Sequence, residues 1–189
     1  MKNTFKNILL FLSAFIPMYF LIIVKLLVEI LNHNLTFNVL NTLVLIVLII
    51  VICLGVYGVK LEVKNKEQKS NKVTILNFKN ITDQHFLGYF SLFVLFAITF
   101  DLSKVSMAVV FVIILSMIGV VYVKNKLFYI NPFLNILGYN FYDITYKDDL
   151  NQIKETRIFY KGNLIKNKEY WVKIKDDNFS FVDKTKMDN

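Results

Sequence analysis

Residues 129–146, YINPFLNILGYNFYDITY, separate a part of the chain suited to lipid from a part suited to water. Asn131 followed by Pro132 predicts the start of a short helix, because Asn caps helices and Pro fits the first helical position. Gly138 predicts the end of that helix, since glycine readily takes the left-handed backbone conformation found there. From Tyr142 to Tyr146, apolar and polar residues alternate, which predicts a strand. The stretch is thus a joint between a membrane segment and a β-structure, although an ordinary connector beside a membrane would contain the same residues.

The composition indicates a membrane protein. Of the 189 residues, 56% are hydrophobic, and the net charge is +8, whereas soluble domains are about half apolar or less. Lysine carries almost all of the positive charge, and Arg157 is the only arginine. Lysines beside membrane spans hold loops in the cytoplasm, so no direct binding of nucleic acid is expected. The single cysteine, Cys53, lies in an apolar run and excludes an internal disulfide.

Long apolar runs predict an α-helical membrane protein with four transmembrane helices and a small β-rich cytoplasmic tail domain. The first run follows a short basic segment, as in a signal peptide, but it is too long and no small-residue cleavage site follows. It is therefore expected to be one uncleaved helix, although Pro17 interrupts it. In the second run, the spacing of Gly55 and Gly58 favours a close approach of another helix. The expected spans, all within residues 1–128, cover about residues 5–31, 39–59, 86–100 and 105–123.

Two ionisable residues lie near the far end of the first span. Lys25 and Glu29 are four residues apart, so a helix places them on one face, where they can form an ion pair. Both are close enough to the interface to reach water, which predicts a structural pair. Ionisable groups within a membrane also often mark functional sites, so a role in sensing ions or signals is the alternative.

Residues 60–80 form the most basic loop of the chain. Leu61 and Val63 on one side and Val73 and Ile75 on the other predict a short hairpin, with a solvated loop as the alternative. In a four-span topology, the lysines near both chain ends lie on the same side as this loop, so the positive-inside rule predicts cytoplasmic termini. The lysines expected to contact lipid headgroups are Lys60, Lys64, Lys66, Lys69 and Lys72.

Residues 129–189 are expected to hold a juxtamembrane helix and a small cytoplasmic β domain. So small a sheet buries little core, and it is expected to lean on the hairpin, on the membrane or on sister subunits. Together with the small residues in the spans, this predicts a homo-oligomer. Alternating segments predict about four strands, at residues 141–146, 155–160, 169–175 and 179–182.

The tail also carries the residues that are expected to bind a partner protein. Tyr170, Val172 and Ile174 alternate along one strand face, and Trp171 lies on the opposite face. Aromatic residues and arginine are enriched in protein contacts, whereas lysine is depleted. We therefore expect the loop lysines to hold the membrane surface and the tail to hold the partner. The candidates for partner binding are Arg157, Tyr160, Tyr170, Trp171 and Lys173.

Sequence motifs for catalysis, metal binding or cofactor binding are missing. The chain contains no HExxH, no phosphate-binding loop, no GxGxxG, no nucleophile elbow and no CxxC. Apart from Lys25 and Glu29, no ionisable residue lies deep in the spans, where an intramembrane enzyme or a proton relay would need one. These observations favour a non-enzymatic protein that needs no cofactor.

The joint carries a resemblance to a known family. It fits the pattern Asn-Pro-x-Leu-x-x-x-Gly-Tyr-x-x-Tyr at Asn131, Pro132, Leu134, Gly138, Tyr139 and Tyr142. With four spans and a β-rich tail, the chain resembles KwaA, the membrane subunit of the Kiwa anti-phage defence system. The resemblance implies an oligomer in the bacterial inner membrane that senses phage attack at the envelope. It also implies a soluble DNA-binding partner subunit, KwaB, on the cytoplasmic side, and it brings no catalytic residues.

The sequence therefore leaves two hypotheses for the function. The leading hypothesis is a sensor and scaffold subunit of a bacterial defence complex in contact with membrane lipid. The alternative is a small oligomeric channel or transporter subunit, with Lys25 and Glu29 lining its outer mouth. A neighbouring gene for a soluble DNA-binding protein would favour the first hypothesis, and liposome conductance that depends on the two ionisable residues would favour the second.

Overall fold

The computed structural model describes residues 2–32, 39–63, 70–125, 127, 131–176 and 179–182. The chain folds into two compact units. The first, called the helical unit here, comprises Met1–Glu62 and Leu87–Phe133. The second, called the barrel unit, comprises Val63–Phe86 and Leu134–Asn189. Each unit is therefore assembled from two separate stretches of the chain.

Helices account for most of the described secondary structure. Two of them, α3 and α5, are long and apolar enough to cross a membrane, and α1 with α2 makes a third candidate if the bent pair is one span. The apolar part of α4, Gly88–Thr99, is shorter. The chain thus has two or three candidate membrane spans among its described residues. The helices are α1 (Lys2–Ala14), α2 (Ile16–Leu31), α3 (Val39–Val63), α4 (Thr82–Thr99), α5 (Val105–Lys124) and α6 (Pro132–Ile136).

The expectation of one continuous helix over residues 5–31 is wrong. The helix breaks at Phe15, and α1 and α2 meet at an angle of 49°. Pro17 causes the break, because it has no N–H to donate to the carbonyl of Ser13 and its ring crowds that carbonyl. Beside the break, the Ser13 hydroxyl donates to the Leu10 carbonyl at 2.7 Å.

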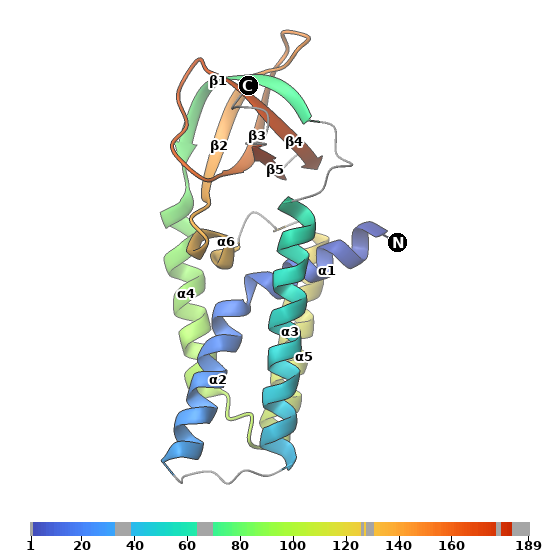
Figure 1. Ribbon diagram of the computed structural model, residues 1–189, viewed down its shortest axis with the longest axis vertical. Coiled ribbons are helices and arrows are strands. Elements are labelled where there is room, and N and C mark those ends of the chain that lie inside the picture. Colours follow the sequence, from blue (N-terminus) through green and yellow to red (C-terminus); the bar gives the residue numbers. More distant parts are fainter. Residues whose placement is uncertain are drawn as a thin grey trace. The chain divides into compact units, whose positions relative to one another are not determined.

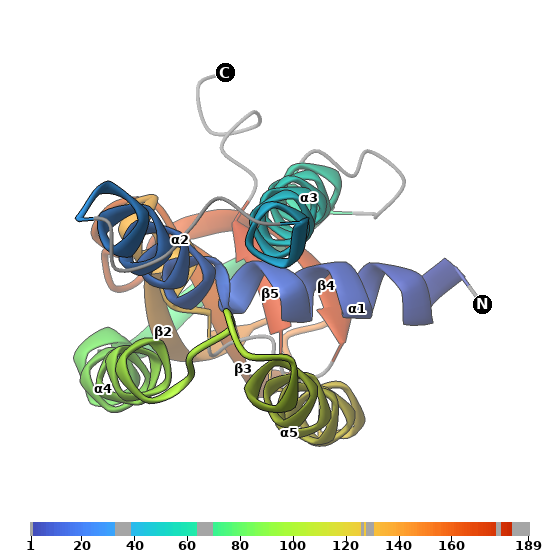
Figure 2. The ribbon, with the colours of Figure 1, turned by 90° about the horizontal axis from the view of Figure 1, so that it is seen from below.

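Within the helical unit, α1 passes between α3 and α5 (Figure 2). Glycines allow this close approach: a Cβ at Gly58 would lie 2.5 Å from the Cβ of Leu9, and one at Gly119 would lie 3.0 Å from the ring of Phe11. Gly55 faces the backbone of α1 at a similarly short distance. The predicted role of Gly55 and Gly58 is confirmed, and the helix that they admit is α1.

The barrel unit contains a closed barrel with the strand order β1-β2-β3-β5-β4 (Figure 1). Four strands, in the order β4-β1-β2-β3, form an antiparallel sheet, and the short β5 closes it by pairing with β4 and, in parallel, with β3. All the predicted tail strands are present. The strands are β1 (Ser70–Asn80), β2 (Asn140–Lys147), β3 (Ile153–Tyr160), β4 (Glu169–Asp176) and β5 (Phe179–Val182).

The hairpin predicted within residues 60–80 is wrong. Leu61 and Val63 belong to α3, and residues 70–80 form the single strand β1. Most of the expected turn lies outside the described residues. The reason for the difference is long-range pairing, because β1 pairs with β2 on one edge and with β4 on the other. Both of its edges are thus satisfied by strands that follow much later in the chain.

Apolar side chains of β1 enter the barrel core. Val73 and Ile75 are buried, and a register shift after Ile75 marks a bulge in the pairing with β2. A bulge reverses the inward and outward alternation of a strand, which brings Phe78 against the core. The tail is expected to need support from another part of the chain. The segment between α3 and α4 provides such support, because it contributes β1 to the barrel. The buried core comprises Val73, Ile75, Tyr142, Ile144, Tyr146, Ile158, Leu164, Tyr170 and Val172.

Candidate functional site

A polar groove lies on the outer face of the barrel, across β1, β2 and β3. It encloses a cavity of about 320 Å³. Strand pairing aligns Lys79, Asp143 and Arg157 in one row across the three strands. A second row contains Asn77, Thr145 and Glu155. The groove therefore presents charges of both signs and lies next to the bulge of β1. Its lining residues are Asn77, Phe78, Lys79, Asp143, Ile144, Thr145, Glu155, Thr156 and Arg157.

An ion pair lies in the middle of this groove. The Nε atom of Arg157 donates to Oδ1 of Asp143 at 3.0 Å, and the side chains of Arg157 and Asp143 are 38% and 47% exposed. An exposed pair of this kind contributes only about 0–1 kcal/mol to stability. The pair therefore adds little to the barrel and remains accessible to a binding partner. Sequence reasoning found Arg157 but missed Asp143 and Lys79, which only the strand register brings beside it.

Trp171 lies on a different strand from Arg157. It is half-buried on β4 and pairs across the sheet with Lys72 of β1, whose Nζ is 2.7 Å from Oε2 of Glu169. In the closed barrel, β1 and β2 lie between β4 and β3 on one side, and β5 lies between them on the other. Trp171 and Arg157 thus lie on different strands of the outer surface of the barrel. The backbone of Lys173 pairs with Ser70 and Phe181, and its side chain lies outside the described residues.

Tyr170, one of the candidates for partner binding, is a core residue of the barrel. Its side chain is 2% exposed, and its hydroxyl oxygen accepts a hydrogen bond from the backbone N–H of Ile165 at 3.0 Å. Tyr170 thereby fixes the loop that precedes β4. Tyr160 packs against the same core, with its ring centroid 5.8 Å from that of Tyr170. The alternation that turns Trp171 outward also turns Tyr170 inward.

The lysines assigned to lipid headgroups are only partly described. Lys60 is exposed in the last turn of α3, where a positive charge suits the helix dipole. Lys72 lies on the barrel beside Trp171, so one of the loop lysines shares a surface with a residue assigned to the partner. Lys64, Lys66 and Lys69 lie outside the described residues. Headgroup contact stays a prediction for all of them.

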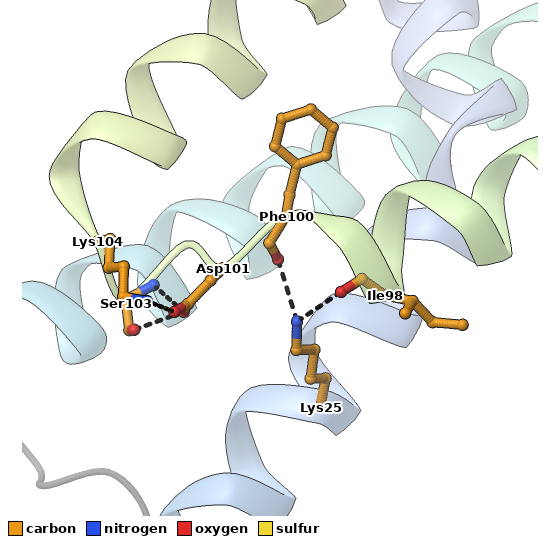
Figure 3. A network of polar contacts seen from close by, with 6 residues as sticks. All are labelled: Lys25, Ile98, Phe100, Asp101, Ser103 and Lys104. Atoms are coloured by element: carbon orange, nitrogen blue, oxygen red, sulfur yellow. Dashed lines mark hydrogen bonds and ion pairs between the residues drawn. The ribbon is translucent and has the colours of Figure 1, made fainter.

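Lys25 binds the end of α4, as Figure 3 shows. Its Nζ donates to the backbone carbonyls of Ile98 at 3.1 Å and Phe100 at 3.3 Å. The last carbonyls of a helix have no partner within the helix and attract positive charge. Among the described side chains, no ion pair joins Lys25 to Glu29, so the expected pair is wrong. The channel alternative, in which both residues line the mouth of a pore, does not depend on that ion pair and stays a hypothesis.

The turn after α4 carries its own polar network, also drawn in Figure 3. The backbone N–H and the hydroxyl of Ser103 both donate to Oδ1 of Asp101, and Lys104 Nζ lies 3.2 Å from Oδ2 of Asp101. The hydrogen bond from the Ser103 side chain is the main cause that lowers the pKa of Asp101, and Lys104 adds to it. This network and Lys25 together fix the connection between α4 and α5.

Asn131 of the joint belongs to the helical core. Its side chain is 1% exposed, and its amide nitrogen donates to Oγ of Ser13 at 2.7 Å. Ser13 in turn donates to the Leu10 carbonyl, so the three residues form a buried chain of hydrogen bonds beside the break at Phe15. Sequence reasoning missed this contact, because 118 residues separate its two partners.

The predicted start and end of the short helix in the joint are confirmed. Pro132 is the first residue of α6, and Gly138 follows the helix with φ of +83°. The N–H of Gly138 donates to the Asn135 carbonyl at 2.9 Å, and that of Tyr139 to the Leu134 carbonyl at 3.0 Å. These two bonds form a Schellman motif, which ends a helix at a left-handed residue.

Comparison with known families defines the identity of the chain. Among the described residues, no group of three His, Cys, Asp or Glu side chains could hold a metal ion. No curated protein and no solved structure matches the chain. The family model described as anti-phage protein KwaA matches residues 6–181, which agrees with the resemblance at the joint. The chain therefore belongs to the KwaA family of anti-phage proteins.

Proposed function

We propose that this anti-phage protein is a non-enzymatic sensor and scaffold subunit in the bacterial inner membrane. The observation that carries the proposal is the origin of β1. This strand lies between α3 and α4 in the chain and pairs in the barrel with β2 and β4 from the C-terminal part. Displacement of either helix would act directly on a strand that the barrel needs for closure.

The polar groove is the proposed docking surface for a soluble DNA-binding partner. Its two rows offer positive and negative groups within one cavity, and such patterns favour specific and fast association. Arginine is also among the residues that contribute most in protein contacts. Trp171, on β4 outside the groove, is a secondary candidate for the same partner.

The proposed topology has four spans, with both termini in the cytoplasm. In it, α1 and α2 form one broken span, and α4 forms a short one. The apolar part of α4, Gly88–Thr99, extends over about 18 Å, which is less than the hydrocarbon thickness of ~30 Å, and local thinning of the bilayer would accommodate the difference. Lys60 and Lys124 lie in the last turns of α3 and α5, and both would lie on the cytoplasmic side.

A homo-oligomer completes the proposal. The outward sides of α3 and α5 expose many large apolar residues, including Ile49, Ile113 and Val120, which suit either lipid or another copy. Small residues and close backbone contacts favour helix association in membranes. Native mass measurement in mild detergent tests this part, and a species that is only monomeric would contradict it.

Co-purification tests the docking surface. The full chain is co-expressed with its neighbouring genes and purified in mild detergent. We expect Arg157→Ala to reduce recovery of the soluble partner strongly. Lys154→Ala is the matched control, because Lys154 lies on the same strand and pairs with Asp148 outside the groove. Recovery of no soluble protein with the unchanged chain would contradict the scaffold role.

A further inference from the structure

The helical unit contains an apolar cavity of about 340 Å³ beside the break between α1 and α2. Its floor is buried and includes Ala14, Phe15 and Phe93, with the two phenylalanine ring centroids 5.2 Å apart. Its rim includes Met117 and Val121 of α5, which are 65% and 52% exposed. The cavity therefore opens beside the apolar helix α5 and extends inward to the break between α1 and α2.

The surroundings of this rim decide what fills the cavity. Met117 and Val121 belong to α5, one of the two helices that by themselves are long and apolar enough to cross a membrane, and in a bilayer their exposed side chains would face hydrocarbon. Water needs several polar partners to occupy a cavity, and the lining offers few. An empty cavity would leave its walls without dispersion contacts. A lipid acyl chain entering from the bilayer restores those contacts without desolvating a polar group.

A positive charge lies at the end of the same helix face. Lys124 follows Val121 by three residues in α5 and is exposed in the last turn. Residues three apart lie on one side of a helix, so the ammonium is on the side of the rim. Lysines at this level of a membrane attract anionic lipid headgroups.

We propose that this cavity binds one acyl chain of an anionic phospholipid, whose headgroup phosphate pairs with Lys124. The chain then contacts Ala14 and Phe15 at the break and reaches Pro132, which also lines the cavity. Pro132 follows Asn131, whose side chain holds Ser13. Lipid occupancy thus stabilises the broken helix and the start of α6. This site goes beyond the proposed scaffold role and does not depend on any protein partner.

Photolabelling of the full chain tests the acyl-chain site. Vesicles of phosphatidylethanolamine contain phosphatidylglycerol with a diazirine near the end of one acyl chain, and labelled peptides are mapped by mass spectrometry. We expect labelling at the peptides that contain Ala14 and Phe93. Val121→Trp fills the rim and should reduce this labelling several-fold. The control Val120→Trp changes an exposed neighbour on α5 that does not line the cavity and should leave the labelling unchanged.

A second pair of variants tests the headgroup. The same diazirine is placed in phosphatidylcholine, and labelling from the two lipids is compared. Lys124→Gln should remove the preference for phosphatidylglycerol. Lys104→Gln, at the other end of α5, should retain it. Equal labelling from both lipids in the unchanged protein would overturn the headgroup assignment.

Two results would overturn the acyl-chain site itself. One is labelling near Phe93 that Val121→Trp leaves unchanged while circular dichroism shows an intact helical fold. The other is efficient crosslinking between two copies from a photo-reactive amino acid in place of Met117, which would mean that a second copy fills the opening. Met117→Trp provides a second rim variant, and unchanged labelling in that variant would also contradict the site.

Discussion

The helical unit and the barrel unit bury their side chains in opposite ways. In the helical unit, the residues beside the break lie inside, and α3 and α5 expose large apolar residues such as Ile49 and Val120. In the barrel, the apolar residues lie inside, and the outer face carries paired charges such as Arg157 and Asp143. One unit is suited to hydrocarbon and the other to water.

This difference indicates what holds each unit together. Apolar burial from water drives folding of the barrel. Within a membrane that force is missing between helices, and close packing of small residues and buried hydrogen bonds take its place. Gly58 against Leu9 and Asn131 with Ser13 are contacts of this kind. Substitutions should therefore act on the two units by different mechanisms.

The largest expected effect is in the barrel core. Ile75→Ala removes a fully buried side chain of β1 and should lower barrel stability by about 2–5 kcal/mol. Unfolding in urea, followed by the fluorescence of the single tryptophan, Trp171, measures the change. Ile153→Ala, at an exposed position of β3, is the control. Equal effects of both substitutions would contradict the role of β1 in the core.

A smaller effect is expected at the crossing of α1 and α3. Gly58→Ala would place a Cβ 2.5 Å from the Cβ of Leu9 and close to its backbone, and such overpacking costs about 1–3 kcal/mol. Gly88→Ala, whose added Cβ meets no atom within 4 Å, should instead be neutral or stabilising by up to about 1 kcal/mol. Helix content during titration with a denaturing detergent compares the two variants. If Gly58→Ala is as stable as Gly88→Ala, α1 is not held in this way.

The buried hydrogen bond of the joint should have a comparable or smaller effect. Asn131→Ala leaves the Ser13 hydroxyl without its donor, and a broken buried hydrogen bond costs about 1–3 kcal/mol. Asn125→Ala, at an exposed position after α5, provides the control. The same detergent titration measures both. A loss confined to the barrel signal would show that Asn131 does not belong to the helical core.

The smallest expected effect concerns the turn before β3. The pKa of Asp148 is lowered, first by the hydrogen bond from Lys154 and then by the backbone N–H groups of Gln152 and Leu150. Because the folded pKa lies below the unfolded one, Asp148 stabilises the fold above the unfolded pKa. That contribution is lost as the pH falls through the folded pKa.

Asp148→Asn should therefore destabilise the barrel slightly at neutral pH. The difference from the unchanged protein should vanish in acid, in urea unfolding repeated across acidic pH. A difference that stays constant over the whole pH range would assign the effect to the turn geometry and not to the charge.

Local chemistry predicted the parts of the fold that depend on neighbouring residues. Pro132 and Gly138 bound α6 as expected, and the alternation of the tail gave its strands. Gly55 and Gly58 indicated a close helix contact. In each case the deciding interaction joins residues close together in the sequence, or it depends on a glycine, which has no side chain. The sequence therefore contains enough information to predict the feature.

Long-range contacts could not be predicted in the same way. The acceptors of Lys25 are backbone carbonyls more than 70 residues away. Because every residue has a backbone carbonyl, the residue types do not show which carbonyl accepts. The strand β1 pairs with strands from the far end of the chain, so a local hairpin was the simpler interpretation. The polar groove depends on the register of three strands, and only that register brings Lys79 and Asp143 beside Arg157.

The central claim is that the polar groove of the barrel holds the soluble partner. A photo-crosslinking amino acid at position 145, in place of Thr145 in the second row of the groove, tests it most directly in living cells. The same amino acid in place of Lys154, on β3 outside the groove, is the control. We predict a crosslink from position 145 to the proposed soluble partner and little from position 154. A crosslink from neither position, or equal yields from both, would contradict it.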